Sequence, residues 1–209
     1  MYNPKHFEER DIAVLHALIG SHPLSTWITL ADGELVANHI PVLVDASRGA
    51  NGTLVAHVAR ANPVWQSFSK DVPSLVVFQG PEGYISPSFY ASKKEHGKVV
   101  PTWNYAVVHA YGTPCAIDDA AWLRRHVTAM TDLQESRHPP GEWKVTDAPA
   151  DFIESMVKMI VGIEIPVDRI EGKWKMSQNR AMGDRVGTVA GLRDRGDMEM
   201  AALVEHLAR

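Results

Sequence analysis

Residues 24–112 consist mainly of short strand-forming segments separated by turn signals, and this succession constrains the fold most strongly. Leu24–Leu30 is rich in threonine, tryptophan and isoleucine, and an Asp-Gly pair typical of hairpin turns follows it. Glu34–Asp45 is predicted as a second strand, in which Pro41 marks a bulge or an edge. Thr53–Arg60 is predicted as a third strand. Together these segments predict a β-meander.

The β pattern continues beyond this meander. Ser74–Gln79 has the composition of a buried strand, and the Gly-Pro-Glu-Gly sequence after it is predicted to turn the chain into Tyr84–Ser86. Lys93–Lys98 is predicted as a polar loop, after which Val99–Tyr111 resumes strand character. About six or more strands, mainly antiparallel, are expected in all, which suits a small barrel.

Helical periodicity lies before and after this β region. Phe7–Gly20 places apolar residues at helical spacing on one face. The other predicted elements are a short helix over Asn62–Phe68, helices over Trp122–Leu133, Phe152–Ile160 and Met200–Leu207, a helix-breaking Pro139-Pro140-Gly141 and a returning strand over Ile163–Ile170. The predicted class is α+β, in one domain of residues 1–209 with a C-terminal helical extension. A separate lobe made of the late helices is the alternative.

Charge and cysteine content narrow the function. The 21 lysines and arginines stand against 25 acids, and this net charge of −4 argues against a monomer that mainly grips duplex DNA. The single cysteine, Cys115, excludes an internal disulfide framework and is predicted to be a buried small hydrophobe. No apolar run reaches the roughly 18 residues of a membrane span. The first residues lack the order of a secretion signal, so a cytoplasmic location is expected.

Familiar catalytic motifs are missing. His39, His57 and His109 would meet if their strands were neighbours, but no HExxH or similar ligand pair exists, so no catalytic metal is expected. The sequence also has no GxSxG, no GxGxxG between a strand and a helix, and no P-loop. A serine hydrolase, a dinucleotide-binding fold and a nucleotide triphosphatase are therefore disfavoured.

One polar cluster ends a predicted strand. Strand alternation puts His57 on one face, whereas Arg60 lies at the strand end beside the helix N-terminus predicted at Asn62. A guanidinium next to free helix amides can bind an anion. The alternative is a surface arginine beside an ordinary helix cap.

Two further clusters combine rings with polar groups. Trp103 and Tyr105 flank Asn104, an arrangement that can stack a planar ligand and bind its polar edge. The alternative is a core tryptophan beside a satisfied asparagine. The segment 172–179 gathers five polar residues around one tryptophan and is predicted to bind phosphate; they are Lys173, Lys175, Ser177, Gln178 and Asn179. The alternative is a solvated charged loop.

A cofactor with a flat ring and a phosphate tail would use all three clusters, and FMN has that shape. The sequence therefore predicts FMN. Another flavin or a haem-like ring remains an alternative, because pockets for flat rings share residue types.

Long motifs throughout the chain support this prediction. They are NPKHF near the start, ANHIP at 37–41, HVARANPVW at 57–65, YISPSFY at 84–90, VPTWNYAVVHAYG at 100–112 and EGKWKMSQN at 171–179. Together they resemble the PaiB-type regulators, which are FMN-binding negative regulators of transcription. The resemblance covers residues 2 to about 192.

The resemblance implies a split β-barrel homodimer that binds FMN at the subunit interface. It implies that Arg60, Lys175, Ser177 and Gln178 hold the phosphate or ribityl chain. It also implies that His57, Trp103 and Asn104 lie near the flavin ring. Repression of transcription follows from the family as well, through contact with DNA or a protein partner.

Three functions are considered on this basis. The first is a flavin-responsive homodimeric repressor. The second is a small FMN-dependent oxidoreductase with a nicotinamide electron donor, because no convincing helix-turn-helix is found and the basic stretch 169–195 overlaps the predicted phosphate site. The third is a binding module that keeps the barrel without the cofactor.

Overall fold

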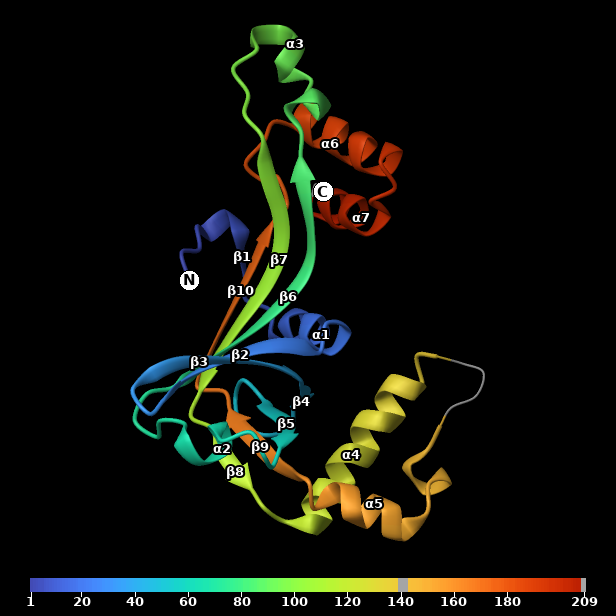
Figure 1. The fold of residues 1–209 in the computed structure, drawn as a ribbon. Helices are drawn as coiled ribbons and strands as arrows, with labels where there is room; N and C mark the ends of the chain where they lie inside the picture. The colour runs from blue at the N-terminus through green and yellow to red at the C-terminus, as the bar shows by residue number, and fades with distance from the viewer. Residues whose placement is uncertain (139–142, 208–209) are drawn as a thin grey trace. The chain divides into compact units, whose positions relative to one another are not determined.

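The computed structural model describes residues 1–138 and 143–207, which form two compact units. Unit 1 contains residues 1–18, 79–109 and 171–207, and unit 2 contains residues 19–78, 110–138 and 143–170. The division between them falls inside α1, β6, β7 and β10, so these four elements contribute to both units (Figure 1). The predicted break at Pro139-Pro140-Gly141 lies outside the described residues.

The elements are short and mostly strands in the first half of the chain. They are η1 (Lys5–Phe7), β1 (Glu8–Glu9), α1 (Ile12–Ser21), β2 (Leu24–Ala31), β3 (Glu34–Pro41), β4 (Leu43–Asp45), β5 (Thr53–Ala59), α2 (Val64–Ser67), β6 (Ser74–Ile85), η2 (Pro87–Phe89), α3 (Ser92–His96), β7 (Thr102–Gly112), β8 (Cys115–Ile117), α4 (Ala120–Glu135), η3 (Val145–Asp147), α5 (Ala150–Val157), β9 (Ile160–Pro166), β10 (Arg169–Lys175), α6 (Met182–Asp194) and α7 (Met198–His206).

Two sheets organise these strands. One has the hydrogen-bonded order β1-β10-β7-β6-β2-β3, and the other has the order β4-β5-β9-β8. The β2–β3 pair is the hairpin predicted from the Asp-Gly turn, in which Asp32 and Gly33 adopt φ of 51° and 86°. β5 pairs with β9 antiparallel over its whole length, with His57 opposite Gly162. The prediction of mainly antiparallel strands is confirmed.

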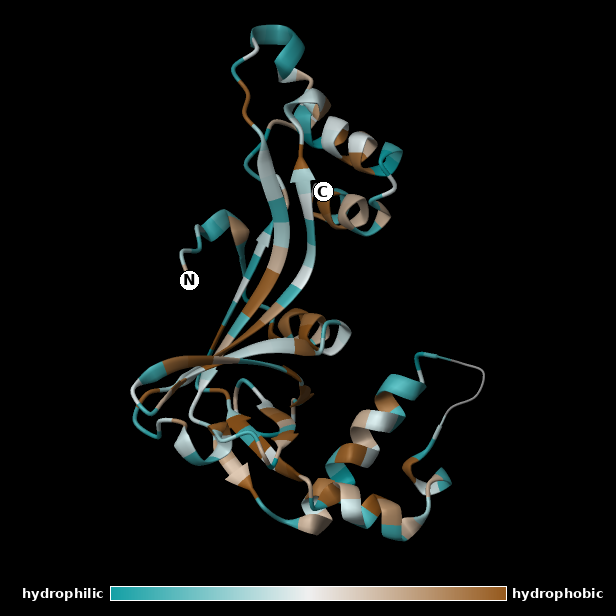
Figure 2. Cartoon of the chain, viewed as in Figure 1, coloured by the Kyte–Doolittle hydropathy of each residue, from teal (hydrophilic) through white to brown (hydrophobic). Residues whose placement is uncertain are grey.

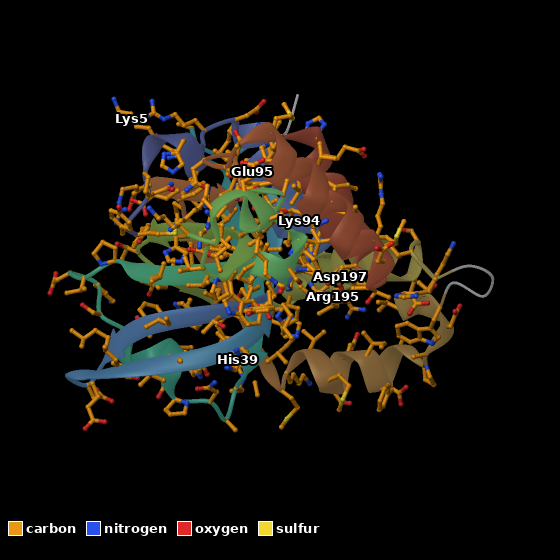
Figure 3. The ribbon with its side chains drawn as sticks, turned by 90° about the horizontal axis from the view of Figure 1, so that it is seen from above. Lys5, His39, Lys94, Glu95, Arg195 and Asp197 are labelled. Atoms are coloured by element: carbon orange, nitrogen blue, oxygen red, sulfur yellow. The ribbon has the colours of Figure 1, made fainter. Side chains whose placement is uncertain are left out.

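In unit 1 the pair α6–α7 forms a helical hairpin, where Leu192, Ala201 and Val204 are completely buried. Gly196 closes the turn between the helices at φ of 87°. Arg195 and Asp197 on either side of this glycine form an ion pair, and Figure 3 shows them together. The sequence did not predict α6, because its hydrophobic spacing is interrupted by glycines.

In unit 2 the core lies against the four-stranded sheet and the β2–β3 hairpin. Trp27, Val161 and Ile163 are completely buried, and Leu54 is almost so. The helices α4 and α5 both carry apolar and polar residues in turn, as Figure 2 shows. The predicted helix over Trp122–Leu133 corresponds to α4, and the one predicted over Phe152–Ile160 corresponds to α5 but ends earlier, since α5 stops at Val157 and Ile160 begins β9.

The turn predicted at Gly80–Gly83 is wrong, because β6 runs through it without interruption. Gly80 packs closely, since a Cβ there would lie 2.8 Å from the Leu18 Cδ1 and 3.3 Å from Ala106, so that the Leu18 side chain would have to shift. In this strand the first glycine of the sequence therefore allows close packing.

Four smaller expectations also need correction. The long strand predicted over 34–45 is interrupted after Pro41, the proline that marked a bulge or an edge. The segment predicted as a polar loop, Lys93–Lys98, overlaps the short helix α3. The first helix begins only at Ile12. Cys115 is exposed, because β8 turns this side chain outward.

Candidate cofactor-binding site

Two lysines of β10 carry most of the positive charge of the predicted phosphate cluster in unit 1. Lys173 is only 7% exposed, and its Nζ donates a hydrogen bond of 3.0 Å to the Tyr2 carbonyl. The Lys175 Nζ donates a hydrogen bond of 2.6 Å to the Thr102 hydroxyl. Both ammonium groups lie near the Tyr105 ring, at 5.4 and 6.0 Å from its centroid. The strand order, which puts β10 beside β7, explains this grouping.

Neither ammonium has a carboxylate within ion-pair distance in the described part of the chain. Glu8 lies opposite Lys173 in the β1–β10 ladder, but its carboxylate accepts a hydrogen bond of 2.6 Å from Arg10 instead. Burial lowers the pKa of the Lys175 ammonium; Tyr105 opposes this shift, and Lys173 and Arg180 add to it. Partly buried cations without an acid partner are unusual and favour an anionic ligand.

A buried amide–hydroxyl pair lies on the same two segments. Asn104 is completely buried, and its Nδ2 lies 3.1 Å from the Ser177 hydroxyl. Ser177 has a left-handed backbone with φ of 63°, which is uncommon for a residue with a side chain. The pairing fixes the turn after β10 next to β7.

The remaining predicted residues of unit 1 are Gln178, which is hydrogen-bonded within its own turn, and Trp103, which is exposed. Gln178 binds its own turn: its Nε2 donates to the Trp174 carbonyl at 2.5 Å, and its Oε1 accepts from the Met176 amide at 2.7 Å. Trp103 is 51% exposed and meets the Tyr84 ring edge-on at a centroid distance of 6.0 Å. This exposed indole lies on β7, the strand that pairs with β10, and it is free to stack on a planar ligand.

The other three predicted residues lie in unit 2, where Arg60 is fully engaged. Its guanidinium forms two hydrogen bonds with the Asp118 carboxylate, at 2.6 and 2.9 Å. It also donates to the Lys158 and Ile160 carbonyls, at 2.7 and 3.0 Å. This pairing lowers the pKa of Asp118. Arg60 therefore ties the end of β5 to the start of β9.

The N-cap of α2 is Pro63 rather than the predicted Asn62, but the Asn62 Oδ1 accepts a hydrogen bond of 3.1 Å from the Val64 amide. Its Nδ2 donates to the Asn38 side-chain oxygen at 2.8 Å. Both ends of the amide are thus used within unit 2, where they fix the loop after β5.

His57 has a partner that the sequence did not reveal. Its Nδ1 lies 3.0 Å from Nε2 of His126 on α4, and burial lowers the pKa of both imidazoles, that of His126 to about 4. The sequence put His126 only on the apolar stripe of a helix. His39 contacts Thr26 instead, and no group of three metal-ligating side chains is found among the described residues.

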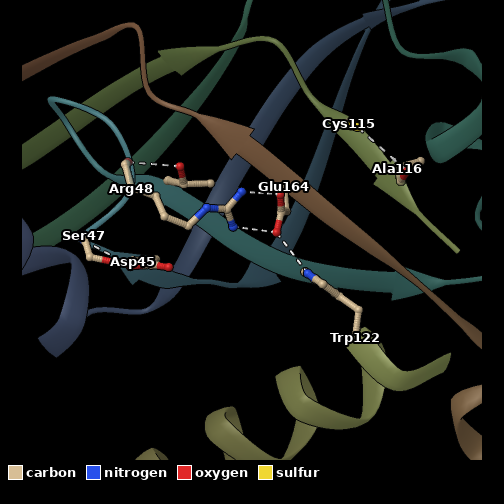
Figure 4. A network of polar contacts seen from close by, with 8 residues as sticks. Asp45, Ser47, Arg48, Cys115, Ala116, Trp122 and Glu164 are labelled. Atoms are coloured by element: carbon tan, nitrogen blue, oxygen red, sulfur yellow. Dashed lines mark hydrogen bonds and ion pairs between the residues drawn. The ribbon is translucent and has the colours of Figure 1, made fainter. Parts of the chain in front are cut away.

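Trp122 holds His126 in place. The two rings stack at a centroid distance of 5.1 Å, and the indole Nε1 donates to the Glu164 carboxylate at 3.0 Å. Figure 4 shows this indole and the Arg48 guanidinium meeting at Glu164, where Arg48 forms two hydrogen bonds of 2.7 Å. Gly162 makes room for the indole, because a Cβ there would lie 2.2 Å from the ring.

The fold and most of the sequence have counterparts in known proteins. Residues 1–169 match the family model described as "Putative FMN-binding domain", and the chain belongs to this family. The family confirms FMN as the predicted cofactor. The match ends before Lys173, so the lysine cluster lies beyond it.

Two relatives extend the likeness over most of the chain. "Protease synthase and sporulation protein PAI 2" of Bacillus subtilis is 29% identical, covering 98% of this chain and 97% of its own. An uncharacterised protein of Emericella nidulans is 34% identical, covering 90% of this chain and 88% of its own. The resemblance to PaiB-type proteins is thereby confirmed.

Two solved structures share the fold. The FAD and heme binding protein from Mycobacterium smegmatis has a TM-score of 0.59 at 17% identity, over 80% of this chain and 73% of that chain. The flavocytochrome Anf3 from Azotobacter vinelandii has a TM-score of 0.56 at 13% identity, over 80% and 69%. Together with the two antiparallel sheets, they confirm the predicted α+β split-barrel class.

The residues of unit 1 fit the phosphate end of FMN. A phosphate needs cationic donors that no carboxylate already neutralises, and Lys173 and Lys175 meet this condition. The exposed Trp103 ring suits a flat heteroaromatic group. Separately, no described helix is long and apolar enough to cross a membrane.

Proposed function

We propose that this chain is an FMN-binding negative regulator of transcription that acts as a homodimer. The observation that carries the proposal is the likeness to the Bacillus protein named for protease synthesis and sporulation, which covers 98% of this chain. That coverage necessarily includes β10 with its two lysines, which the family model does not reach.

In this proposal the lysines of β10 neutralise the phosphate, because they lack acid partners. Trp103 covers the ring, and Ser177 and Asn104 would have to release their mutual hydrogen bond to hold the ribityl chain or the ring edge. The remaining residues of the proposed set are His57, Arg60, Asn62 and Gln178. Arg60 and Gln178 would have to exchange their present partners, so we expect them to contribute less than Lys175.

Bound FMN supplies a ring that can be oxidised and reduced. The protein would respond through the strand that carries the lysines, because β10 is hydrogen-bonded to both β1 and β7. An effector that binds two states unequally shifts the balance between them. The regulatory signal is therefore proposed to be flavin occupancy or redox state.

A basic surface for DNA is present but small. Lys93, Lys94 and Lys98 are exposed on and after α3, with Glu95 between them. The helical hairpin α6–α7 does not resemble a recognition unit, because its second helix carries Glu199 and Glu205. A protein partner is therefore an equal candidate for the regulated contact.

A gel-shift series with oxidised, reduced and flavin-free protein tests the regulatory proposal. We expect retardation of a promoter fragment that changes with the flavin state, and a two-subunit mass in sedimentation. Retardation in none of the three states would refute direct DNA binding, and a monomer in every state would refute the dimer.

The second candidate is a small FMN-dependent oxidoreductase that takes electrons from a nicotinamide. The net charge of −4 and the acidic second helix of the α6–α7 hairpin favour it over a DNA-binding role. Steady oxidation of NADH or NADPH by the FMN-loaded protein with an added acceptor would support it. A flavin that stays oxidised under these conditions would contradict it.

A further inference from the structure

Unit 2 contains an apolar cavity, and of the residues proposed for FMN only His57 lines it. Its volume is about 460 Å³, which lies within the range of small-molecule sites. The wall is apolar, with Val127 from α4, Ile153 and Met156 from α5, and Ile160 from β9. No charged side chain lines it, so it suits a neutral ligand.

This cavity leaves apolar surface in contact with water. Met156 is 45% exposed, and Met159 at its edge is 58% exposed. Methionines on an open apolar surface are frequent where ligands of varied shape are bound. An occupant that covers them would remove this unfavourable exposure.

His57 supplies a polar group inside the cavity, and its hydrogen-bond state follows from its partner. His57 Nδ1 faces His126 Nε2, whereas the Nδ1 of His126 is buried and has no partner in the described part of the chain. A proton on that Nδ1 would be a buried donor without an acceptor, which is rare and costly. The proton of His126 is therefore on Nε2, from which it is donated to His57.

This assignment fixes the other nitrogen of His57. A neutral imidazole has one N–H, and because Nδ1 of His57 accepts, the proton is on Nε2. Burial lowers the pKa of both rings, so neutral imidazoles are expected near pH 7. No hydrogen bond of His57 Nε2 is found among the described residues, so this N–H is available to a ligand in the cavity.

We propose that this cavity binds a small, neutral, mainly apolar molecule whose carbonyl oxygen accepts a hydrogen bond from Nε2 of His57. The stacked Trp122 and the recess at Gly162 hold the histidine pair in this orientation. The polar group is fixed in advance, and the methionines adapt to the apolar body of the ligand.

Two probes of the same shape test the proposal, 2-acetylnaphthalene and 2-ethylnaphthalene, which differ in the carbonyl oxygen. Equilibrium dialysis gives the affinity of each for the whole chain and for His57→Phe, which keeps a ring but removes the donor. The ratio of the two affinities is expected to shift by about 2- to 12-fold towards the hydrocarbon in the variant. An unchanged ratio would overturn the proposal.

A second variant locates the binding. Thr131→Phe adds a ring inside the cavity without touching the histidines, and Val186→Phe adds the same ring at an exposed position of α6 as the matched control. We expect Thr131→Phe to weaken both probes at least tenfold and Val186→Phe to leave them unchanged. The proposal is overturned if a folded Thr131→Phe variant binds both probes as tightly as the native chain does. It is also overturned if the native chain binds neither probe.

Two other occupants are distinguished in the same experiments. If Thr131→Phe also abolishes FMN binding, the cavity belongs to the cofactor. A second copy of this chain covers the apolar surface at Met156 and Met159 if three results coincide: the native dimer dissociates on dilution, Met159→Glu also dissociates it, and the probes fail to bind. Either result overturns the proposal, whereas failure of the native chain to bind FMN would refute only the proposed function.

Discussion

The two units hold their ionisable side chains differently. In unit 2 Arg48 pairs with Glu164, Arg60 pairs with Asp118, and the imidazoles of His57 and His126 contact each other. In unit 1 the lysines of β10 are held by a carbonyl, a hydroxyl and an aromatic ring. Groups satisfied by the protein stabilise the fold, whereas cations left without an acid are available to a ligand. The contrast separates structural from binding residues.

The largest effect is expected from acid on unit 2. The pKa of His126 is lowered from 6.5 to about 4, so the unfolded chain binds the proton more readily. Stability is therefore complete above about pH 6.5 and is lost as the pH falls to about 4, by roughly 3 kcal/mol. Urea unfolding at several pH values measures this loss, and it should be much smaller in His126→Phe. If the free energy of unfolding depended equally on pH in both proteins, the result would contradict a buried His57–His126 pair.

Removal of Lys175 should produce the next largest effect, on cofactor affinity. Lys175→Ala is expected to weaken FMN binding by about 1.5–3 kcal/mol, because a charge-assisted hydrogen bond to the phosphate is lost. Fluorescence titration with FMN measures it, and riboflavin, which lacks the phosphate, is the control ligand. An equal loss for riboflavin would show that Lys175 does not contact the phosphate.

Lys173 should show opposite effects on stability and on binding. Lys173→Met keeps the aliphatic stem but removes a buried charge without an acid partner, so the flavin-free protein should become more stable by about 1 kcal/mol. FMN affinity should fall at the same time. Thermal unfolding with and without FMN separates the two effects, and a destabilised flavin-free variant would contradict the idea of an unpaired cation.

Arg60 is expected to give the smallest effect on affinity. Because Asp118 already occupies its guanidinium, Arg60→Ala should lower the melting temperature and weaken FMN binding less than Lys175→Ala does. A loss of affinity equal to that of Lys175→Ala would show that Arg60 leaves Asp118 for the phosphate. The contrast between the units would then not hold.

Local signals in the sequence predicted much of the fold. The hairpin at Asp32-Gly33 and the long amphipathic helix α4 follow from turn chemistry and periodicity. The Gly-Pro-Glu-Gly sequence gave a wrong prediction of a turn, because its first glycine allows close packing against Leu18, a residue distant in the chain. Such contacts have no local signature.

The candidate site was predictable in composition but not in partners. The lysines and aromatic residues of the motifs identify a cluster suited to an anion, and the structure groups Lys173, Lys175 and Tyr105. That Asp118 neutralises Arg60 depends on the pairing of β9 with both β5 and β8, which alternation within one strand cannot reveal. The contact between His57 and His126 could not be predicted for the same reason, since a histidine on the apolar stripe of a helix is read as a core residue.

The recess at Gly162 has a consequence for how this chain can vary. Any larger residue there displaces the indole of Trp122, and with it the orientation of His126. Substitutions at these two positions are thus not independent. A library of variants selected for folding should contain residues larger than glycine at position 162 mainly when position 122 carries a residue smaller than tryptophan. One hydrogen atom in place of a methyl group thereby restricts the allowed sequences on a helix 40 positions earlier in the chain.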